Sequence, residues 1–340
     1  MSENFDKTKA FIVIGLGSMG TRRVKHCLEQ KYEVIGYDVR YDRTQKARNE
    51  LQIQVVENFL ELENIIKTRD VSGVFIDVPP AEHFRYMQYC FDKNINFFVE
   101  QPAVHTQTLV KLCQNYANEL RYRKQSMTIQ VSCNLRKSKL VNKLRDMIQK
   151  HEVSTPVYAH VECAEYLPDW HPYEPYTDYY PSSKNMGGGL DVICDIDWLS
   201  YLFGMFRIVD KREYHKSKLM IDTYDVMHYT LEFAAGPLVT IYEDFLQRTP
   251  EHTVKLVTPN QVIFADFINN TIRINEGEGK DKLIEIEPVD CSKFSSNDKN
   301  WNWVEETYYL ETLEFISRVS RKDTSLTSLN NELYKLTQLL

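Results

Sequence analysis

The sequence predicts an α/β protein in two parts: a doubly wound parallel sheet in residues 1–125 and an α+β domain with an open, mostly antiparallel sheet in residues 126–340. Two patterns carry this prediction. Early in the chain, short apolar runs alternate with helical stretches, which is typical of parallel sheets. Later, apolar strands follow one another with short turns between them, which is typical of antiparallel sheets. The 340 residues are enough for two domains, each with its own core.

The first predicted strand ends in a glycine-rich turn. The apolar run Phe11–Ile14 predicts a buried strand, and the helix-forming stretch Thr21–Gln30 follows it. Between them, the spacing Gly-x-Gly-x-x-Gly is formed by Gly15, Gly17 and Gly20. In dinucleotide-binding folds the first glycine makes a tight turn, the second lets the backbone approach the pyrophosphate, and the third packs helix against strand. The start of the helix, with Ser18 and Met19, would then face the phosphates.

A second predicted strand, Lys31–Tyr37, ends at the acidic residue Asp38. This acid follows the glycines by about twenty residues, where a carboxylate binds a ribose hydroxyl. Strand, glycines, helix and acid together predict a Rossmann domain that binds a dinucleotide. Asp38 favours NAD, because a carboxylate repels the 2′-phosphate of NADP, although Arg40 and Arg43 nearby keep NADP open.

Three more strands complete the predicted parallel sheet. The first, from Val71, is stopped by Pro79 and Pro80, which cannot continue a ladder. The other two are Ile95–Glu100 and Ser126–Cys133, with helices before and between them. Ligands of such sheets bind at the carboxyl ends of the strands. We therefore expect one crevice lined by Gly15, Asp38, Pro79, Glu100 and Gln101.

The second half of the chain changes in texture after a helix expected at Lys139–Lys150. The alternating run Val157–Ala164 predicts a half-buried strand. Further strands are expected at 226–233, 238–245, 254–257, 262–267, 271–275 and 283–286. Helices at Glu306–Val319 and Ser328–Leu340 close the chain and can pack back on the first domain. The open sheet offers a surface for self-association, so we expect a homo-oligomer.

Composition excludes several classes of protein. A net charge of −7 argues against a nucleic-acid binder, which would be basic. The N-terminus is polar, without a secretory signal, and no apolar run approaches the ~20 residues that span a bilayer. The seven cysteines are scattered without a Cys-x-x-Cys pair. This pattern favours the cytoplasm and argues against a disulfide framework or a zinc knuckle, so we predict no metal site.

Three stretches together resemble the glucose–fructose oxidoreductase / inositol dehydrogenase (Gfo/Idh/MocA) family: the glycine loop, Asp77–His83, and Glu100-Gln101-Pro102 in place of the family's Glu-Lys-Pro. The resemblance implies NAD or NADP in the first domain and a sugar, polyol or related substrate against the second. The cofactor site then comprises Gly15, Gly17, Ser18, Met19, Gly20, Asp38, Val39, Arg40, Val78, Pro79, His83, Glu100 and Gln101. For His83, a structural role at the start of a helix is an equal alternative.

A more particular resemblance covers Tyr166–Tyr173 and Lys184–Gly189. It is similar to family members of bacterial surface-glycan and nonulosonic (sialic-like) acid pathways. Those members continue from the glycines into Asp-x-x-His-Glu-x-Asp. Here the corresponding stretch is Asp191–Asp197, which starts two residues sooner than in those members.

The sequence departs from the family at the two residues that stand by the reacting carbon. Gln101 replaces the lysine and Cys194 replaces the histidine. Glutamine has no useful pKa and cannot act as a general base, but it can hydrogen-bond a substrate or the nicotinamide carboxamide. The acids Asp191 and Asp195 would raise the pKa of Cys194, so a packed thiol is favoured over a nucleophile.

Other residues are candidates for the missing proton transfer. His171 has a suitable ordinary pKa of ~6.5, although an aromatic loop that packs on its own fold is the favoured alternative. Tyr180 and Asp191 are further candidates, and Asp191 can equally cap the start of a helix.

Two hypotheses of function follow. The first is an NAD(P)-dependent oxidoreductase that moves hydride to or from a sugar, nucleotide sugar or nonulosonic acid derivative, with unusual proton-transfer residues. The alternative is a regulatory protein that binds NAD but has lost the chemistry, as the replacement of both proton carriers suggests.

Overall fold

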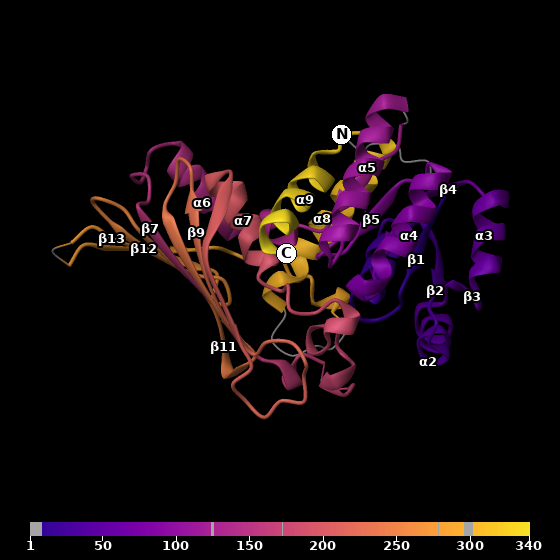
Figure 1. Ribbon diagram of the computed structural model, residues 1–340, viewed down its shortest axis with the longest axis horizontal. Helices are drawn as coiled ribbons and strands as arrows, with labels where there is room; N and C mark the ends of the chain where they lie inside the picture. The colour runs from indigo at the N-terminus through magenta and orange to yellow at the C-terminus, as the bar shows by residue number, and fades with distance from the viewer. Residues whose placement is uncertain (1–8, 124–125, 172, 278, 296–301) are drawn as a thin grey trace. The chain divides into compact units, whose positions relative to one another are not determined.

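The computed structural model describes residues 9–123, 126–171, 173–277, 279–295 and 302–340 (Figure 1). It divides into two units: residues 1–132 with 308–338 and 340, and residues 133–307 with 339. The expected boundary after residue 125 therefore differs from that of the structure, in which the first unit continues to Ser132 and takes in the chain again from Tyr308. Residues 1–8, part of the polar N-terminus, lie outside the described residues.

The first unit is built on a six-stranded sheet in the order β3-β2-β1-β4-β5-β6, with every neighbouring pair parallel. The doubly wound fold is thus confirmed. Its sequential order reverses between β1 and β4, which is where such sheets bind ligands. The very short β3 was not predicted. The strands are β1 (Ala10–Ile14), β2 (Glu33–Tyr37), β3 (Gln54–Val56), β4 (Val71–Ile76), β5 (Phe97–Val99) and β6 (Ile129–Val131).

Helices connect these strands, and two more come from the end of the chain. The connecting helices are α1 (Ser18–Glu29), α2 (Tyr41–Lys46) with a π-helical turn (Ala47–Leu51), α3 (Phe59–Thr68), α4 (Pro80–Lys93) and α5 (Gln107–Arg123). The last two are α8 (Asn302–Ser320) and α9 (Thr327–Leu339).

Three phenylalanines of the parallel sheet meet one phenylalanine of α8. The ring centroids of Phe11, Phe75 and Phe98 lie 6.3, 5.1 and 5.8 Å from that of Phe315. All four side chains are buried. They sit on β1, β4 and β5, so α8 fixes the middle of the sheet from one face.

A buried arginine of α1 ties several of these elements together. The Arg23 guanidinium lies 2.6 Å from a carboxylate oxygen of Glu100 after β5 and 2.9 Å from one of Glu311 on α8. It also lies 3.9 Å from Asp77 after β4. Burial would lower the pKa of Arg23, but these three carboxyl groups outweigh it and raise the pKa above its ordinary value.

The second unit contains an eight-stranded sheet in the order β14-β13-β12-β11-β7-β10-β9-β8. Its neighbours are antiparallel except β7 and β10, which are parallel. The prediction of an open, mostly antiparallel sheet is confirmed. The strands are β7 (Tyr158–Tyr166), β8 (Phe206–Tyr214), β9 (Val226–Phe233), β10 (Leu238–Asp244), β11 (Leu246–Val257), β12 (Val262–Asp266), β13 (Thr271–Asn275) and β14 (Asp281–Glu285).

The edge strand β8 and the first half of β11 were not predicted. Charged residues interrupt the apolar alternation of β8, as is common on sheet edges. The unit also contains α6 (Lys139–Gln149) and α7 (Ile193–Phe203), with short 3₁₀ turns between Leu167 and Met186. Asp195 and Trp198 of α7 contact His252 and Phe267, so α7 covers the buried face of the sheet.

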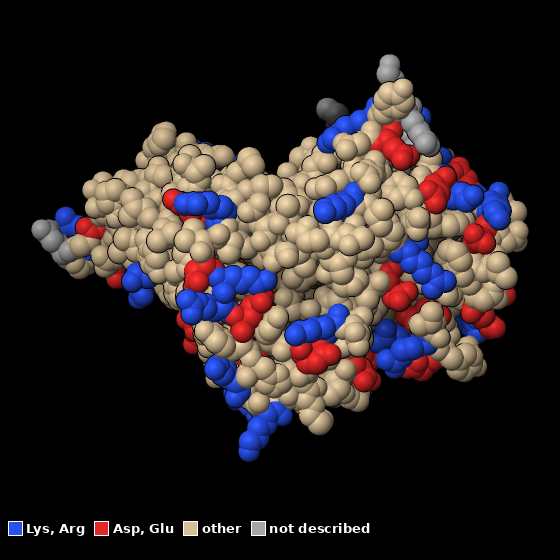
Figure 2. All heavy atoms as spheres, viewed as in Figure 1, with Lys and Arg blue, Asp and Glu red and all other residues tan. Residues whose placement is uncertain are grey.

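Three further features concern the surface charges, the cysteines and the length of the helices. On the face shown in Figure 2, basic and acidic side chains are interspersed. All seven cysteines are free. Among the described residues, no helix combines the length and the apolar character needed to cross a bilayer.

Replacing Arg23 by methionine should destabilise the first unit severely. The change leaves Glu100 and Glu311 without their buried cation, which typically costs about 3–5 kcal/mol. Urea denaturation measures the loss. Arg69→Met is the matched control, because Arg69 pairs with Glu33 at the surface and its loss should cost about 1 kcal/mol or less. Equal effects of the two substitutions would contradict the structural role of Arg23.

Candidate functional site

The glycine loop between β1 and α1 allows a ligand to approach its backbone. Gly15 has φ +92°, and a Cβ there would lie 2.4 Å from the carbonyl oxygen of Asp77. A Cβ at Gly20 would lie 1.7 Å from the carbonyl oxygen of Gly15, so strand and helix pack this closely only with glycine. At Gly17 the nearest atoms belong instead to the flexible Arg43 guanidinium, 3.1 Å away.

The start of α1 suits a phosphate. Gly17 precedes the helix without a side-chain cap, and the first turn carries no acidic residue. The backbone N–H groups of this turn, which includes Ser18, Met19 and Gly20, can therefore bind an anion, helped by the helix dipole. The three glycines and this helix start fit the pyrophosphate of a dinucleotide.

Asp38, at the end of β2, is held beside the glycine loop. Its Oδ2 accepts a hydrogen bond of 2.6 Å from the Leu16 N–H, and its Oδ1 accepts one of 2.8 Å from the Arg40 N–H. Each carboxylate oxygen keeps a second lone pair for a ribose hydroxyl. The Arg43 guanidinium lies 3.9 Å from Oδ2, while Val39 is 79% exposed beside Asp38.

His83 connects the loops that follow β4 and β5. Its buried ring places Nε2 2.7 Å from the Val78 carbonyl oxygen and Nδ1 2.9 Å from that of Pro102. Burial lowers the pKa of His83. Both ring nitrogens thus face backbone, so His83 positions these loops, while Pro79 is exposed at the start of α4.

Gln101 is held by an ion pair from the end of the chain. Its Nε2 donates a hydrogen bond of 2.8 Å to Oε2 of Glu332 on α9, and the same oxygen lies 2.9 Å from Nζ of Lys335. The other oxygen of Glu332 accepts from the Ala103 N–H at 3.1 Å. Glu332 and Lys335 are fully buried, at 0% and 1% exposure. The Lys335 ammonium is therefore linked to Gln101 through the Glu332 carboxylate. Gln101 is the residue that the family resemblance places at the position of the lysine.

Residues 9–128 match the family model GFO_IDH_MocA, described as "Oxidoreductase family, NAD-binding Rossmann fold". The match covers the segment that forms most of the first unit, so this segment is similar to the NAD-binding domains of that family. The predictions of an NAD(P)-dependent oxidoreductase and of NAD as its cofactor are confirmed at the level of this family. No curated protein matches the sequence.

Solved structures share the fold over nearly the whole chain. An oxidoreductase from Agrobacterium radiobacter, in complex with NAD+, L-tartaric acid and magnesium, has a TM-score of 0.80 at 12% identity, covering 98% of this chain and 94% of that one. An inositol dehydrogenase homologue with NAD+ from Azotobacter vinelandii has 0.78 at 12%, covering 99% and 94%. UDP-N-acetylglucosamine 3-dehydrogenase from Acidithiobacillus ferrooxidans has 0.72 at 15%, covering 96% and 94%. At these identities the likeness shows the fold alone.

In the second unit, the structure brings two of the predicted catalytic residues together. The Tyr180 hydroxyl donates a hydrogen bond of 2.8 Å to Oδ1 of Asp191. Oδ2 of Asp191 is buried and has no hydrogen-bond partner among the described residues. Burial raises the pKa of Asp191 to about 6, against the opposing effect of Tyr180. Lys184 lies over the Tyr224 ring, with its Nζ 4.8 Å from the ring centroid.

The resemblance to the Gfo/Idh/MocA family places Cys194 where those proteins have a histidine, and the structure keeps its thiol protonated near neutral pH. Burial raises its pKa well above the ordinary value, and Asp191, Asp195 and Glu243 raise it further. The sequence had indicated this direction from two of these acids. Cys194 is therefore unsuited to carry a proton near neutral pH.

His171 lies among aromatic residues of the loop after β7. Its ring contacts Tyr179 edge-on, with centroids 4.7 Å apart, and Tyr173 at 5.7 Å. The Tyr179 hydroxyl donates to the His171 carbonyl oxygen. These contacts agree with the favoured alternative of a loop that packs on its own fold, and its catalytic role stays a prediction.

A buried cluster next to Asp191 was missed from the sequence. It contains Glu165, Glu243 and His252 from three strands, with Asp195 from α7. Burial raises the pKa of Glu165 to about 7. Burial also raises the pKa of Glu243 well above its ordinary value, and Asp195 adds to this. The signal in the sequence was weak, because these residues come from distant strands and each looks like an isolated polar residue.

The Asp191 carboxyl should make stability fall as pH rises. Its folded pKa of about 6 exceeds the ordinary 3.8, so its ionisation opposes folding. Its favourable contribution is complete below pH ~4 and is lost through pH ~6, with a total of about 2–3 kcal/mol. Asp191→Asn should therefore gain stability relative to wild type at pH 8 but not at pH 4.5, as urea denaturation can measure. Glu285→Gln, at an exposed position, controls for net charge. Parallel pH profiles of Asp191→Asn and wild type would rule this out.

Proposed function

We propose that this chain is an NAD-dependent oxidoreductase of the Gfo/Idh/MocA type that moves hydride to or from one carbon of a sugar, nucleotide sugar or nonulosonic acid derivative. The observation that carries the proposal is the intact cofactor cradle, in which Asp38 is held by two backbone N–H groups beside the glycine loop. A chain that had lost its cofactor would have no need to keep both features. We place the reaction in the cytoplasm, in a homo-oligomer, as the sequence predicts.

NAD is preferred to NADP in this proposal. The Asp38 carboxylate would repel a 2′-phosphate. The Arg43 guanidinium, which could otherwise bind that phosphate, lies near Oδ2 of Asp38. The residues that would hold NAD are Gly15, Gly17, Ser18, Met19, Gly20, Asp38, Val39, Arg40, Val78, Pro79, Glu100 and Gln101. When bound, the nicotinamide supplies the hydride-transfer chemistry.

Proton transfer is assigned to the pair Tyr180 and Asp191. A carboxyl group with a pKa of about 6 can hold or release a proton near neutral pH, and the tyrosine hydroxyl bonded to it can relay that proton. Gln101 orients the reacting group by hydrogen bonding, with Glu332 fixing its amide. The substrate class rests on the family resemblance, and the glycan-pathway assignment on Tyr166–Tyr173 and Lys184–Gly189.

Hydride transfer can be tested directly. Calorimetry should show tighter binding of NAD than of NADP, and absorbance should report reduction or oxidation with a member of a panel of nucleotide sugars and CMP-linked nonulosonates. Asp191→Asn should remove the limb of the pH–rate profile near pH 6, while NAD affinity stays at the wild-type value. NAD binding without turnover of any panel member would favour the regulatory alternative.

Gln101→Ala should lower kcat/KM by about tenfold or more, because one orienting hydrogen bond worth about 1.5 kcal/mol is lost. Steady-state kinetics on the active substrate measure this change. Gln107→Ala is the matched control, since Gln107 also donates to α9, at the Thr337 carbonyl oxygen, without a predicted role in the site. If both variants behave alike, Gln101 has no part in orienting the substrate.

A further inference from the structure

Three side chains of the types that bind metal ions in proteins form one row across the middle of the second sheet. Cys163 on β7 is paired with His252 on β11 in antiparallel register, and with Glu243 on β10 in parallel register. Directly paired residues on neighbouring strands place their side chains on the same face, with Cβ atoms about 4.5–5.5 Å apart. The parallel pairing of β7 and β10 thus brings a thiol, an imidazole and a carboxyl group side by side.

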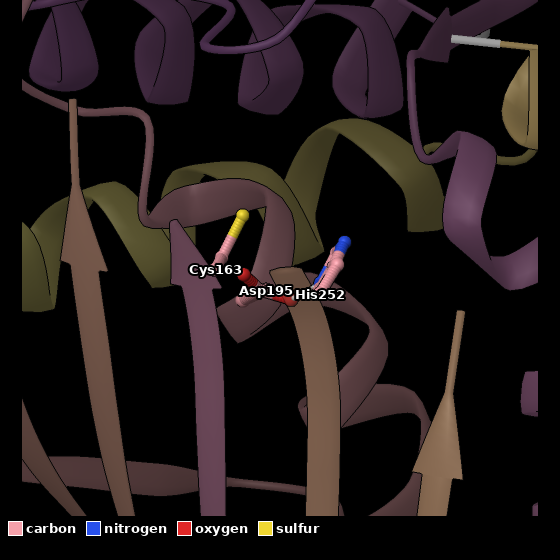
Figure 3. A group of neighbouring side chains, drawn as sticks. All are labelled: Cys163, Asp195 and His252. Carbon is pink, nitrogen blue, oxygen red and sulfur yellow. Dashed lines mark hydrogen bonds and ion pairs between the residues drawn. The ribbon is translucent and has the colours of Figure 1, made fainter. Parts of the chain in front are cut away.

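Helix α7 adds a fourth group above this row. Oδ1 of Asp195 lies 2.8 Å from Nε2 of His252. One donor atom each from Cys163, Asp195 and His252 lies within 4.8 Å of the other two (Figure 3). Glu243 is near enough to Asp195 to share a hydrogen bond with it.

We propose that Cys163, Asp195 and His252 bind a divalent metal ion of the zinc type, with Glu243 as the fourth ligand. A thiolate, an imidazole and carboxylates form a donor set that suits zinc. Zinc bonds of about 2.0–2.3 Å in a tetrahedron separate the donors by about 3.3–3.8 Å. The separations in the trio, from 2.8 Å between Asp195 and His252 to at most 4.8 Å, lie on either side of this range. The proposal does not depend on the oxidoreductase activity.

The charge of the cluster supports a bound cation. Glu165, Asp195 and Glu243 are 8%, 2% and 5% exposed, and His252, the basic group hydrogen-bonded to Asp195, is 4% exposed. Buried charges in proteins are paired or coordinate metals. A dication at this point would stabilise the ionised forms of these carboxyl groups, which outnumber the single imidazole.

Neighbouring side chains orient the proposed ligands. Trp198 Nε1 donates a hydrogen bond of 2.5 Å to Asp195, and the Phe267 ring stacks on the His252 ring, with centroids 4.4 Å apart and planes 18° apart. Contacts that orient the side chains bound to an ion are typical of metal sites. Cys163 is partly buried.

Metal binding by the full-length protein tests the proposal. After removal of metals by a chelator, the protein is titrated with Zn²⁺ and with Co²⁺. We expect one ion per chain, a higher melting temperature with Zn²⁺, and a sulfur-to-cobalt absorption band with Co²⁺. Cys163→Ser should abolish the band and weaken Zn²⁺ binding by at least about tenfold. Cys133→Ser is the matched control, because Cys133 is also partly buried in the same unit, and it should keep the band.

Two results would overturn the metal site. One is the absence of the sulfur-to-cobalt band in wild-type protein, which needs no variant and therefore no assumption about folding. The other is equal Zn²⁺ affinity in wild type and Cys163→Ser, which would mean that the ion binds elsewhere and that Asp195 and His252 form an ion pair only. If Cys163→Ser fails to fold, the presence or absence of the wild-type band still decides the outcome.

Discussion

The buried ion pairs of Arg23 are the interactions on which the first unit depends. This side chain follows the glycine loop by one turn of α1 and pairs with Glu100, the residue before Gln101, and with Glu311 on α8. One buried guanidinium thus sets the distance between the phosphate-binding loop and the end of β5. Removing a partner of a buried ion pair costs far more than the pair contributes, so the arrangement resists substitution.

The candidate cofactor site could be proposed from the sequence, because the residues that indicate it lie close together in the chain. Gly15, Gly17 and Gly20 have a fixed spacing that only a few backbone shapes require, and Asp38 follows at the expected interval. The fold class followed from the same logic, since alternating and consecutive strands leave visible patterns in the sequence. The edge strand β8 escaped because the charges that protect an edge also mask the alternation.

Gln101, Tyr180 and Asp191 were candidates from the sequence, but the contacts around the candidate catalytic residues could not be predicted, because most of them join residues far apart in the chain. Glu332 and Lys335 look like an ordinary pair on a surface helix, yet they are buried and hold Gln101. His252 can be recognised as a neighbour of Cys163 only from the register of β7 and β11. Neither the pairing of Tyr180 with Asp191 nor the row across the sheet has a spacing that sequence patterns recognise.

The discontinuous first unit has a consequence for synthesis of the protein. The glycine loop and Arg23 leave the ribosome long before their partners Glu311 and Glu332 are made. At translation rates of about 5–20 residues per second, the ~180 residues between the end of β6 at Val131 and Glu311 take roughly 9–36 seconds, during which the parallel sheet lacks these partners. During that interval the Arg23 charge lacks Glu311, and the apolar surface that later contacts Phe315 stays uncovered.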